Sequence, residues 1–113
     1  MSQTDEKKPK PVERLFPFVL RAKLLILGQE AVFRSRKRVQ FVLISTDLSP
    51  NSKTKILSDF PTIPVIQRFS SEELSAFFQA NKAKVVGFKR SSLASAILSE
   101  LKPWQVKKLK TEN

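Results

Sequence analysis

Apolar residues near the start of the chain recur at the spacing of one helical face. Leu15, Val19, Ala22 and Leu25 lie four, three and three positions apart, which predicts an amphipathic helix. Pro17 falls within this stripe, and proline is tolerated only in the first turn of a helix. We therefore expect the helix to begin near Pro17 or to bend there.

A second short helix is expected after Gly28, beginning at Glu30 and continuing through the apolar residues 31–33. Its last turn should carry four basic residues that suit the negative end of the helix dipole, namely Arg34, Arg36, Lys37 and Arg38. Residues 41–44 are then a continuous, largely β-branched apolar run with polar neighbours. That pattern predicts a strand buried on both faces.

Helices and strands continue to alternate along the rest of the chain. Ser49 as N-cap with Pro50 at the first helical position predicts a third helix toward Leu57. Ser70 followed by Glu73 is a capping box, which predicts the start of a fourth helix. The apolar face of this fourth helix should consist of Leu74, Phe77 and Phe78. Strands are expected at 65–69 and 84–88. A last helix should be capped by Ser91 or Ser92 and carry Leu93, Ile97 and Leu101 on one face. We therefore expect an α/β fold, a three-layer α/β/α sandwich around a small mixed or parallel sheet.

The length of 113 residues allows one domain with one core. Residues 1–11 have no apolar side chain after Met1, so we expect a disordered arm there. The domain is expected to span 12–102. Residues 103–113 should form a basic tail, in which Trp104 either packs back on the core or stacks on nucleic acid.

The composition excludes much of catalytic chemistry. The chain has no His, Cys or Tyr, so it lacks an imidazole base, a thiol nucleophile and soft metal ligands. Its two glycines, Gly28 and Gly87, are too few for a phosphate-binding glycine loop. The carboxylates Asp47, Glu72 and Glu73 have no metal-binding spacing. We expect a binding protein rather than an enzyme, with no cofactor and no metal.

The charge indicates an anionic partner. The net charge is +11, and residues 12–102 alone carry 15 basic and 7 acidic residues, a net charge of +8, so the folded part must present a basic face. No apolar run approaches the roughly 20 residues of a membrane span. The first residues are polar and lack an apolar signal region. We expect a cytoplasmic protein that does not bind membranes.

Several strings, in their order and spacing, resemble the kink-turn-binding ribosomal protein superfamily of the L-seven-Ae and L-thirty-e type. The nearest branch is similar to the small bacterial YlxQ-like proteins, and the resemblance covers roughly residues 15–101. The strings are LRAKL at 20–24, LGQEAV at 27–32, FVLISTDLSPN at 41–51, IPV at 63–65, SEEL at 71–74 and VVGF at 85–88. The resemblance implies the α/β/α fold and binding of structured RNA.

The family's RNA contact falls on Gly28, Gln29 and Glu30 in this chain. A helix start offers unpaired N–H groups to phosphate, and a glycine lets the RNA backbone approach closely. The Gln29 amide could bond to a base edge, and the Glu30 carboxylate could accept from guanine protons exposed in sheared G·A pairs. Phe33 stands where the family has a lysine, and the nearest basic side chain is Arg34.

The candidate RNA-binding residues each have a structural alternative. Glu30 could simply favour the helix dipole, and the basic run 34–38 could be a solvated helix end or, less in keeping with the rest, a nuclear import signal. The family also uses the loop that here carries Lys82 and Lys84. Lys89 and Arg90 are open candidates. The candidate set is Gly28, Gln29, Glu30, Arg34, Arg36, Lys37, Arg38, Lys82 and Lys84, whereas Phe33, Phe41, Phe77, Phe78 and Phe88 are expected in the core.

These observations favour a non-enzymatic protein that binds a kinked or internally looped RNA. We expect this RNA to be ribosomal RNA, bound in association with ribosomal or ribonucleoprotein proteins. A protein-interaction or regulatory scaffold of the same fold is the first alternative. A substrate-binding appendage of a separate RNA-modifying enzyme is the second.

Overall fold

The computed structural model describes residues 11–107 and contains a four-stranded sheet in the order β1-β4-β2-β3. The strands are β1 (Leu25–Leu27), β2 (Val39–Ile44), β3 (Val65–Gln67) and β4 (Val85–Lys89). β4 runs antiparallel to both β1 and β2, and β2 runs parallel to β3. The sheet is therefore mixed, which is one of the two arrangements expected from the sequence.

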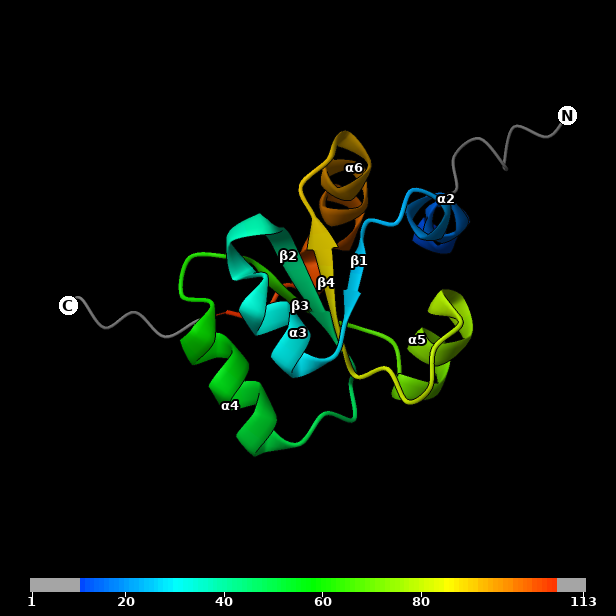
Figure 1. The fold of residues 1–113 in the computed structure, drawn as a ribbon. Coiled ribbons are helices and arrows are strands. Elements are labelled where there is room, and N and C mark those ends of the chain that lie inside the picture. Colours follow the sequence, from blue (N-terminus) through cyan, green and yellow to red (C-terminus); the bar gives the residue numbers. More distant parts are fainter. Residues whose placement is uncertain (1–10, 108–113) are drawn as a thin grey trace, which may run out of the picture.

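Helices cover both faces of this sheet, which gives the three-layer α/β/α sandwich (Figure 1). One face carries α3 (Gln29–Arg34) and α4 (Pro50–Asp59). The other carries α2 (Phe16–Arg21), α5 (Ser71–Phe78) and α6 (Ser92–Leu101). Short 3-10 turns precede α2 (η1, Val12–Leu15), follow α3 (η2, Arg36–Arg38) and follow α6 (η3, Lys102–Trp104).

The alternation of side chains along β2 builds two separate cores. Phe41 and Leu43 point toward α2, α5 and α6, whereas Val42 and Ile44 point toward α3 and α4. All four side chains are fully buried, as expected for a strand apolar on both faces. On the first face Phe41 stacks on Phe88 of β4, with ring centroids 4.4 Å apart.

The predicted helix starts are confirmed by their caps. Ser49 accepts a hydrogen bond from the Ser52 N–H with Pro50 in the first turn, and Ser91 accepts one from the Ala94 N–H. Ser70 and Glu73 form the reciprocal capping box of α5. These ends could be found from sequence because a cap depends on residues three positions apart.

The prediction for the first apolar stripe was wrong beyond Arg21. α2 ends there, Lys23 adopts a positive φ of 58°, and Leu25 belongs to β1 rather than to the helix. Ala22, expected on the buried face, is exposed. β1 has only three residues, and its pairing partner β4 lies some 60 residues later in the chain. No local pattern in the sequence therefore predicts β1.

The strand expected at 65–69 is shorter in the structure. β3 ends at Gln67, and Phe69 adopts a positive φ of 71°, which ends the extended backbone. The Arg68 N–H still donates to the Ile44 carbonyl at 3.2 Å. The chain then turns directly into the capping box of α5.

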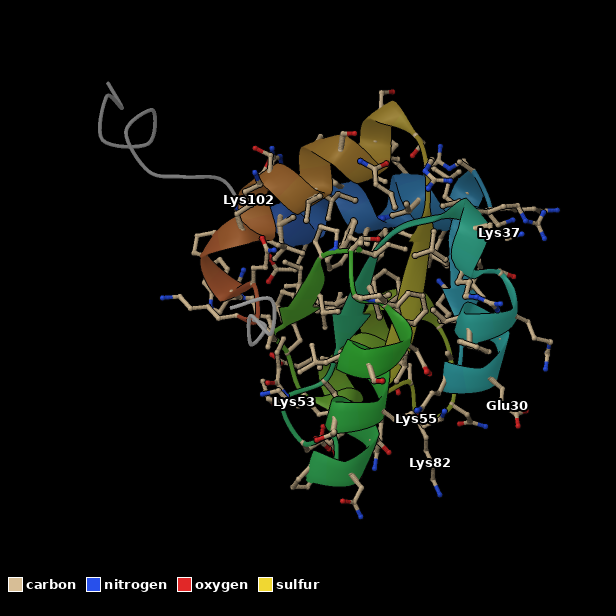
Figure 2. The ribbon with its side chains drawn as sticks, turned by 90° about the vertical axis from the view of Figure 1, so that its left-hand side faces the viewer. Glu30, Lys37, Lys53, Lys55, Lys82 and Lys102 are labelled. Carbon is tan, nitrogen blue, oxygen red and sulfur yellow. The ribbon has the colours of Figure 1, made fainter. Side chains whose placement is uncertain are left out.

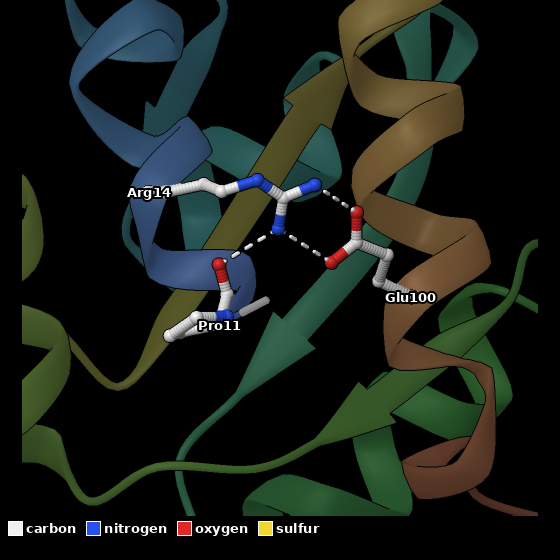
Figure 3. Close-up of polar contacts among 3 residues, drawn as sticks. All are labelled: Pro11, Arg14 and Glu100. Carbon is white, nitrogen blue, oxygen red and sulfur yellow. Dashed lines mark hydrogen bonds and ion pairs between the residues drawn. The ribbon is translucent and has the colours of Figure 1, made fainter. Parts of the chain in front are cut away.

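Ion pairing joins the first 3-10 turn to the last long helix. The Arg14 guanidinium donates to both carboxylate oxygens of Glu100 at 3.0 and 2.8 Å, and also to the Pro11 carbonyl at 2.8 Å (Figure 3). These hydrogen bonds lower the pKa of Glu100 below its usual value. The start of the described chain is thus held against α6.

The Asp47 carboxylate joins the loop after β2 to the start of α5. It accepts hydrogen bonds from the Ser71 hydroxyl at 2.7 Å and from the Ser71 N–H at 3.0 Å. The hydroxyl bond is the main reason that the pKa of Asp47 falls from 3.8 to about 2. These bonds favour the ionised carboxylate in the folded state.

We expect this contact to stabilise the protein above about pH 4 and to be lost as the pH falls toward 2. The folded-state pKa lies below the unfolded one, so protonation favours the unfolded chain in that window. The urea midpoint of Asp47→Asn should lie below that of the wild type at pH 6, and the gap should shrink at pH 2.5. Ser71→Ala removes the hydroxyl donor but keeps the N–H donor. It should therefore lower the urea midpoint less than Asp47→Asn does at both pH values. A gap that does not change with pH would contradict this assignment.

Candidate nucleic-acid interface

Gly28 holds the start of α3 in a conformation that other residues rarely adopt. Its φ is +99°, and its carbonyl accepts the first helical hydrogen bond from the Val32 N–H at 2.9 Å. Its own N–H donates to the Val85 carbonyl at 2.9 Å, which ties the helix start to the start of β4. Apart from Gly28 and its two chain neighbours, no residue has an atom within 4 Å of where a Cβ would stand, so the surface above Gly28 is open.

Gln29 and Glu30 begin α3 beside this open surface. Gln29 is partly buried, and the Glu30 side chain is 94% exposed. Glu30 lies 3.8 Å from the Arg34 guanidinium, one turn later on the same helix, and the Arg34 side chain is 70% exposed. An ion pair this long and this exposed adds little to stability, so the Glu30 carboxylate is accessible to a partner.

Gly87 brings α3 close to the sheet. A Cβ on Gly87 would lie 3.1 and 3.3 Å from the methyl groups of Val32 and 3.3 Å from one of Val39. Val32 is the fully buried residue of α3. The glycine in β4 therefore sets the height of the helix that carries Gln29 and Glu30 above the sheet.

Phe33 is a correction to the predicted core. Phe41, Phe78 and Phe88 are buried and Phe77 is partly buried, but Phe33 is 37% exposed. α3 has six residues, and Val32 is the one that it turns toward the sheet. The next side chain, that of Phe33, therefore points toward solvent rather than into the core. The Arg36 guanidinium carbon lies 4.2 Å from the Phe33 ring centre, and the Lys55 ammonium lies 5.8 Å from it.

The prediction that the basic run forms the last turn of the second helix was wrong. α3 ends at Arg34, and Arg36, Lys37 and Arg38 form the separate turn η2. The helix ends early because the chain must enter β2 at Val39. The Arg36 guanidinium donates to the Phe33 carbonyl at 2.9 Å and so satisfies a carbonyl at the end of the helix. The turn surrounds a hollow of about 380 Å³ lined by Arg34, Ser35, Arg36, Lys37 and Arg38.

Arg90 joins this basic turn from a distant part of the chain. Its guanidinium donates to the Lys37 carbonyl, and its N–H donates to the Arg38 carbonyl at 3.2 Å. Of the two open candidates, Arg90 is therefore placed beside the turn by hydrogen bonds. Its neighbour Lys89 ends β4 and is partly buried.

A groove of about 530 Å³ separates α3 from α4. It is lined by Gln29, Glu30, Phe33, Asn51, Ser52, Lys55 and Asp59. Asn51, Ser52 and Lys55 were not predicted as site residues, because only the packing of α4 beside α3 brings them there. The Asp59 carboxylate lies 3.4 Å from the Lys55 ammonium and partly neutralises its charge.

Lys82 and Lys84 lie in the loop before β4. Both are exposed, and the Lys84 carbonyl accepts from the Ser45 N–H at 2.9 Å. Figure 2 shows Lys82 and Lys55 at the same end of the molecule as Glu30. Basic side chains from four segments therefore lie on or near α3. We call them the α3 surface, which consists of Arg34, Arg36, Lys37, Arg38, Lys55, Lys82, Lys84 and Arg90.

Between residues 11 and 107, no three acidic side chains gather where they could share a metal ion. Within the same range, no helix is both long and apolar enough to cross a membrane.

Comparisons with known proteins show the fold. No protein-family model matches the chain, and no curated protein matches it. A solved structure of a protein of unknown function from Bacillus halodurans is similar over 83% of this chain and 99% of its own, with 21% identity and a TM-score of 0.75. The Giardia lamblia 15.5kD RNA binding protein is similar over 82% of this chain and 86% of its own, with 12% identity and a TM-score of 0.64. The chain therefore has the fold of these two proteins.

Proposed function

We propose that this protein binds structured RNA through the α3 surface and that it is not an enzyme. The observation that carries the proposal is the convergence on one short helix of basic side chains from α3, α4, the loop before β4 and the β4–α6 turn. Charges that repel one another when brought together are stabilised by an anion. A polyanion with one charge per nucleotide matches such a surface.

Specificity in this proposal comes from Gln29 and Glu30. Both lie beside the open surface over Gly28 and line the groove between α3 and α4. The amide can donate to and accept from a base edge, and the carboxylate can accept from guanine N–H groups, whereas the basic side chains contact phosphates. A carboxylate within a basic surface would oppose simple phosphate binding, so its exposure there favours contact with base donors.

The finer parts of the proposal rest on the sequence resemblance and on one structural neighbour. The neighbour from Giardia is an RNA-binding protein with the same fold. Together with the strings around Gly28 and Gln29, this supports membership of the kink-turn-binding superfamily. We propose as target a kinked or internally looped RNA, with ribosomal RNA as the leading candidate, in the cytoplasm and together with ribosomal or ribonucleoprotein partners.

The affinity for structured RNA should fall steeply as salt increases. Each phosphate contact that releases counterions contributes about −0.7 to −0.9 to the slope of log affinity against log salt. Lys37→Ala, which removes an exposed charge of the α3 surface, should make this slope shallower by about one contact. Arg21→Ala, on α2 at the opposite face of the sheet, should leave the slope unchanged.

Fluorescence anisotropy of a labelled internal-loop RNA at several salt concentrations measures these slopes. A salt-independent affinity would overturn the proposal. Tight binding of a protein partner without measurable RNA binding would favour the scaffold alternative.

A further inference from the structure

The single tryptophan lies outside the α3 surface. Trp104 ends η3, and the chain beyond it docks against the open edge of β3, where Gln105 bridges to Ile66 and the Val106 N–H donates to the Val65 carbonyl at 2.8 Å. Val106 is partly buried and packs against the core on the α3 and α4 face. The backbone on both sides of Trp104 is thus fixed, yet its side chain remains 41% exposed.

Arg68 contacts this exposed ring and a buried one. Its guanidinium carbon lies 3.8 Å from the Trp104 ring centre and 4.6 Å from that of Phe69, which is only 7% exposed. The position of Phe69 is fixed in turn by the hydrogen bond from the Thr46 N–H to its carbonyl, at 2.8 Å. The ring contacts therefore hold the guanidinium in place from the core outward.

The hydrogen-bonding capacity of this guanidinium is unused. Within residues 11–107, no hydrogen bond or ion pair joins the Arg68 side chain to another residue. A guanidinium that stacks through its face keeps its N–H groups free at the edge, where they match the oxygens of a phosphate. Lys102 and Lys107 are exposed on the same C-terminal segment and add positive charge.

An ordered, exposed indole beside an unpaired guanidinium is suited to single-stranded nucleic acid. Every base can stack on an aromatic face, whatever its sequence, while the backbone phosphate meets the basic group. An acidic peptide would use the positive charges but would leave the exposed part of the indole without a partner. Charge and shape together favour a nucleotide.

We propose that Arg68 and Trp104 bind an unpaired nucleotide of the RNA, with the base stacked on Trp104 and its phosphate bonded to Arg68. The inference rests on the proposed function for the choice of RNA as partner. Figure 2 shows Lys102, the first residue of η3, on the side of the molecule opposite to Glu30 and Lys37. The two sites therefore engage different parts of an RNA, and the second one fits a strand that leaves the structured element.

The intrinsic fluorescence of Trp104 reports on this site directly, because the chain has no other tryptophan. Two probes are titrated against the full chain: a single-stranded RNA of about ten nucleotides, and an internal-loop hairpin with no unpaired flank. Labelled copies measure binding independently by anisotropy. We expect the single strand to quench the fluorescence and the hairpin to bind without quenching it.

Two variants and a matched control complete the test. Trp104→Leu, which keeps an apolar side chain, should weaken single-strand binding about fivefold to a hundredfold and leave hairpin binding unchanged. Arg68→Lys keeps the charge and the fluorophore but loses the planar guanidinium, so it should weaken binding of the single strand as well. Phe18→Leu should change nothing, although it also removes an exposed ring near an arginine, with Arg21 at 5.6 Å.

The outcomes separate this inference from the proposed function. Single-strand binding without quenching, and of equal strength in the wild type and both variants, would overturn the Arg68–Trp104 site whether or not the hairpin binds. Quenching by a polyglutamate peptide but not by RNA would overturn it as well. Quenching by the single strand with no hairpin binding would support the site and overturn the α3 surface as a structured-RNA interface.

Discussion

Glu30→Ala will weaken binding of an internal-loop RNA with sheared G·A pairs by about 1–3 kcal/mol, by analogy with a base-edge contact in duplex DNA. The same change will leave binding of a fully paired hairpin equal or slightly tighter. The substitution removes a negative charge from a protein of net charge +11, so electrostatics alone would strengthen binding to every RNA. Only a contact between the carboxylate and base donors gives the opposite sign for one RNA.

Glu30→Ala should change RNA binding with little effect on folding stability. The Glu30 side chain is 94% exposed, and its ion pair with Arg34 spans 3.8 Å, so the cost in folding stability should stay near 0.5 kcal/mol. Glu30 also lies in the first turn of α3, where an acid favours the helix dipole. Glu30→Gln keeps the shape without the charge and shows how much of the effect depends on the carboxylate.

Arg34→Ala is the matched comparison on the same helix face. It should weaken binding of both RNAs to a similar degree and make the salt slope shallower by about one contact. Anisotropy titrations of both RNAs at one salt concentration measure the two variants, and circular dichroism checks that helicity is unchanged. If Glu30→Ala improves binding to both RNAs, Glu30 serves only the helix dipole and the proposed specificity site is wrong.

Phe88→Ala will lower the free energy of unfolding by about 3–5 kcal/mol. Phe88 is fully buried in β4, stacks on Phe41 at 4.4 Å and meets the Phe78 ring edge at 6.0 Å. Truncation removes these contacts and leaves a cavity between the sheet and the helices that cover this face. A loss of this size is a large fraction of the stability of a small domain.

Phe33→Ala is the matched control for a buried phenylalanine. Phe33 is 37% exposed and contacts chiefly the Arg36 guanidinium, so the loss should be about 1 kcal/mol or less. Urea unfolding of the three proteins, with the slope checked for two-state behaviour, measures both changes. Equal losses from the two substitutions would show that Phe33 belongs to the core after all.

The sequence alone determined the elements that rest on local chemistry. The caps at Ser49, Ser70 and Ser91 were predictable because each one satisfies helix N–H groups within the same turn. The buried run 41–44 was predictable because a strand covered on both faces needs no alternation. The alternation of such elements, in turn, predicted the layered α/β architecture.

Elements that depend on distant partners were missed or misplaced. β1 pairs with β4 through three residues only, and Leu25 could therefore be counted on a helical face that ends four residues earlier. Phe33 looked like core because its type is apolar, and only the orientation of α3 against Gly87 turns it outward. In both cases the deciding contacts lie more than fifty residues away along the chain.

The candidate site shows the same division. The strings around Gly28, Gln29 and Glu30 and the basic run 34–38 are visible in the sequence, because their residues are adjacent in the chain. Only the tertiary structure placed Lys55 and Arg90 beside them, through the packing of α4 and the hydrogen bonds of the β4–α6 turn. Likewise, the sequence left open whether Trp104 packs back on the core or stacks on nucleic acid. The docking of its segment on β3 decided that the ring contacts Arg68, because edge pairing joins residues that no local pattern connects.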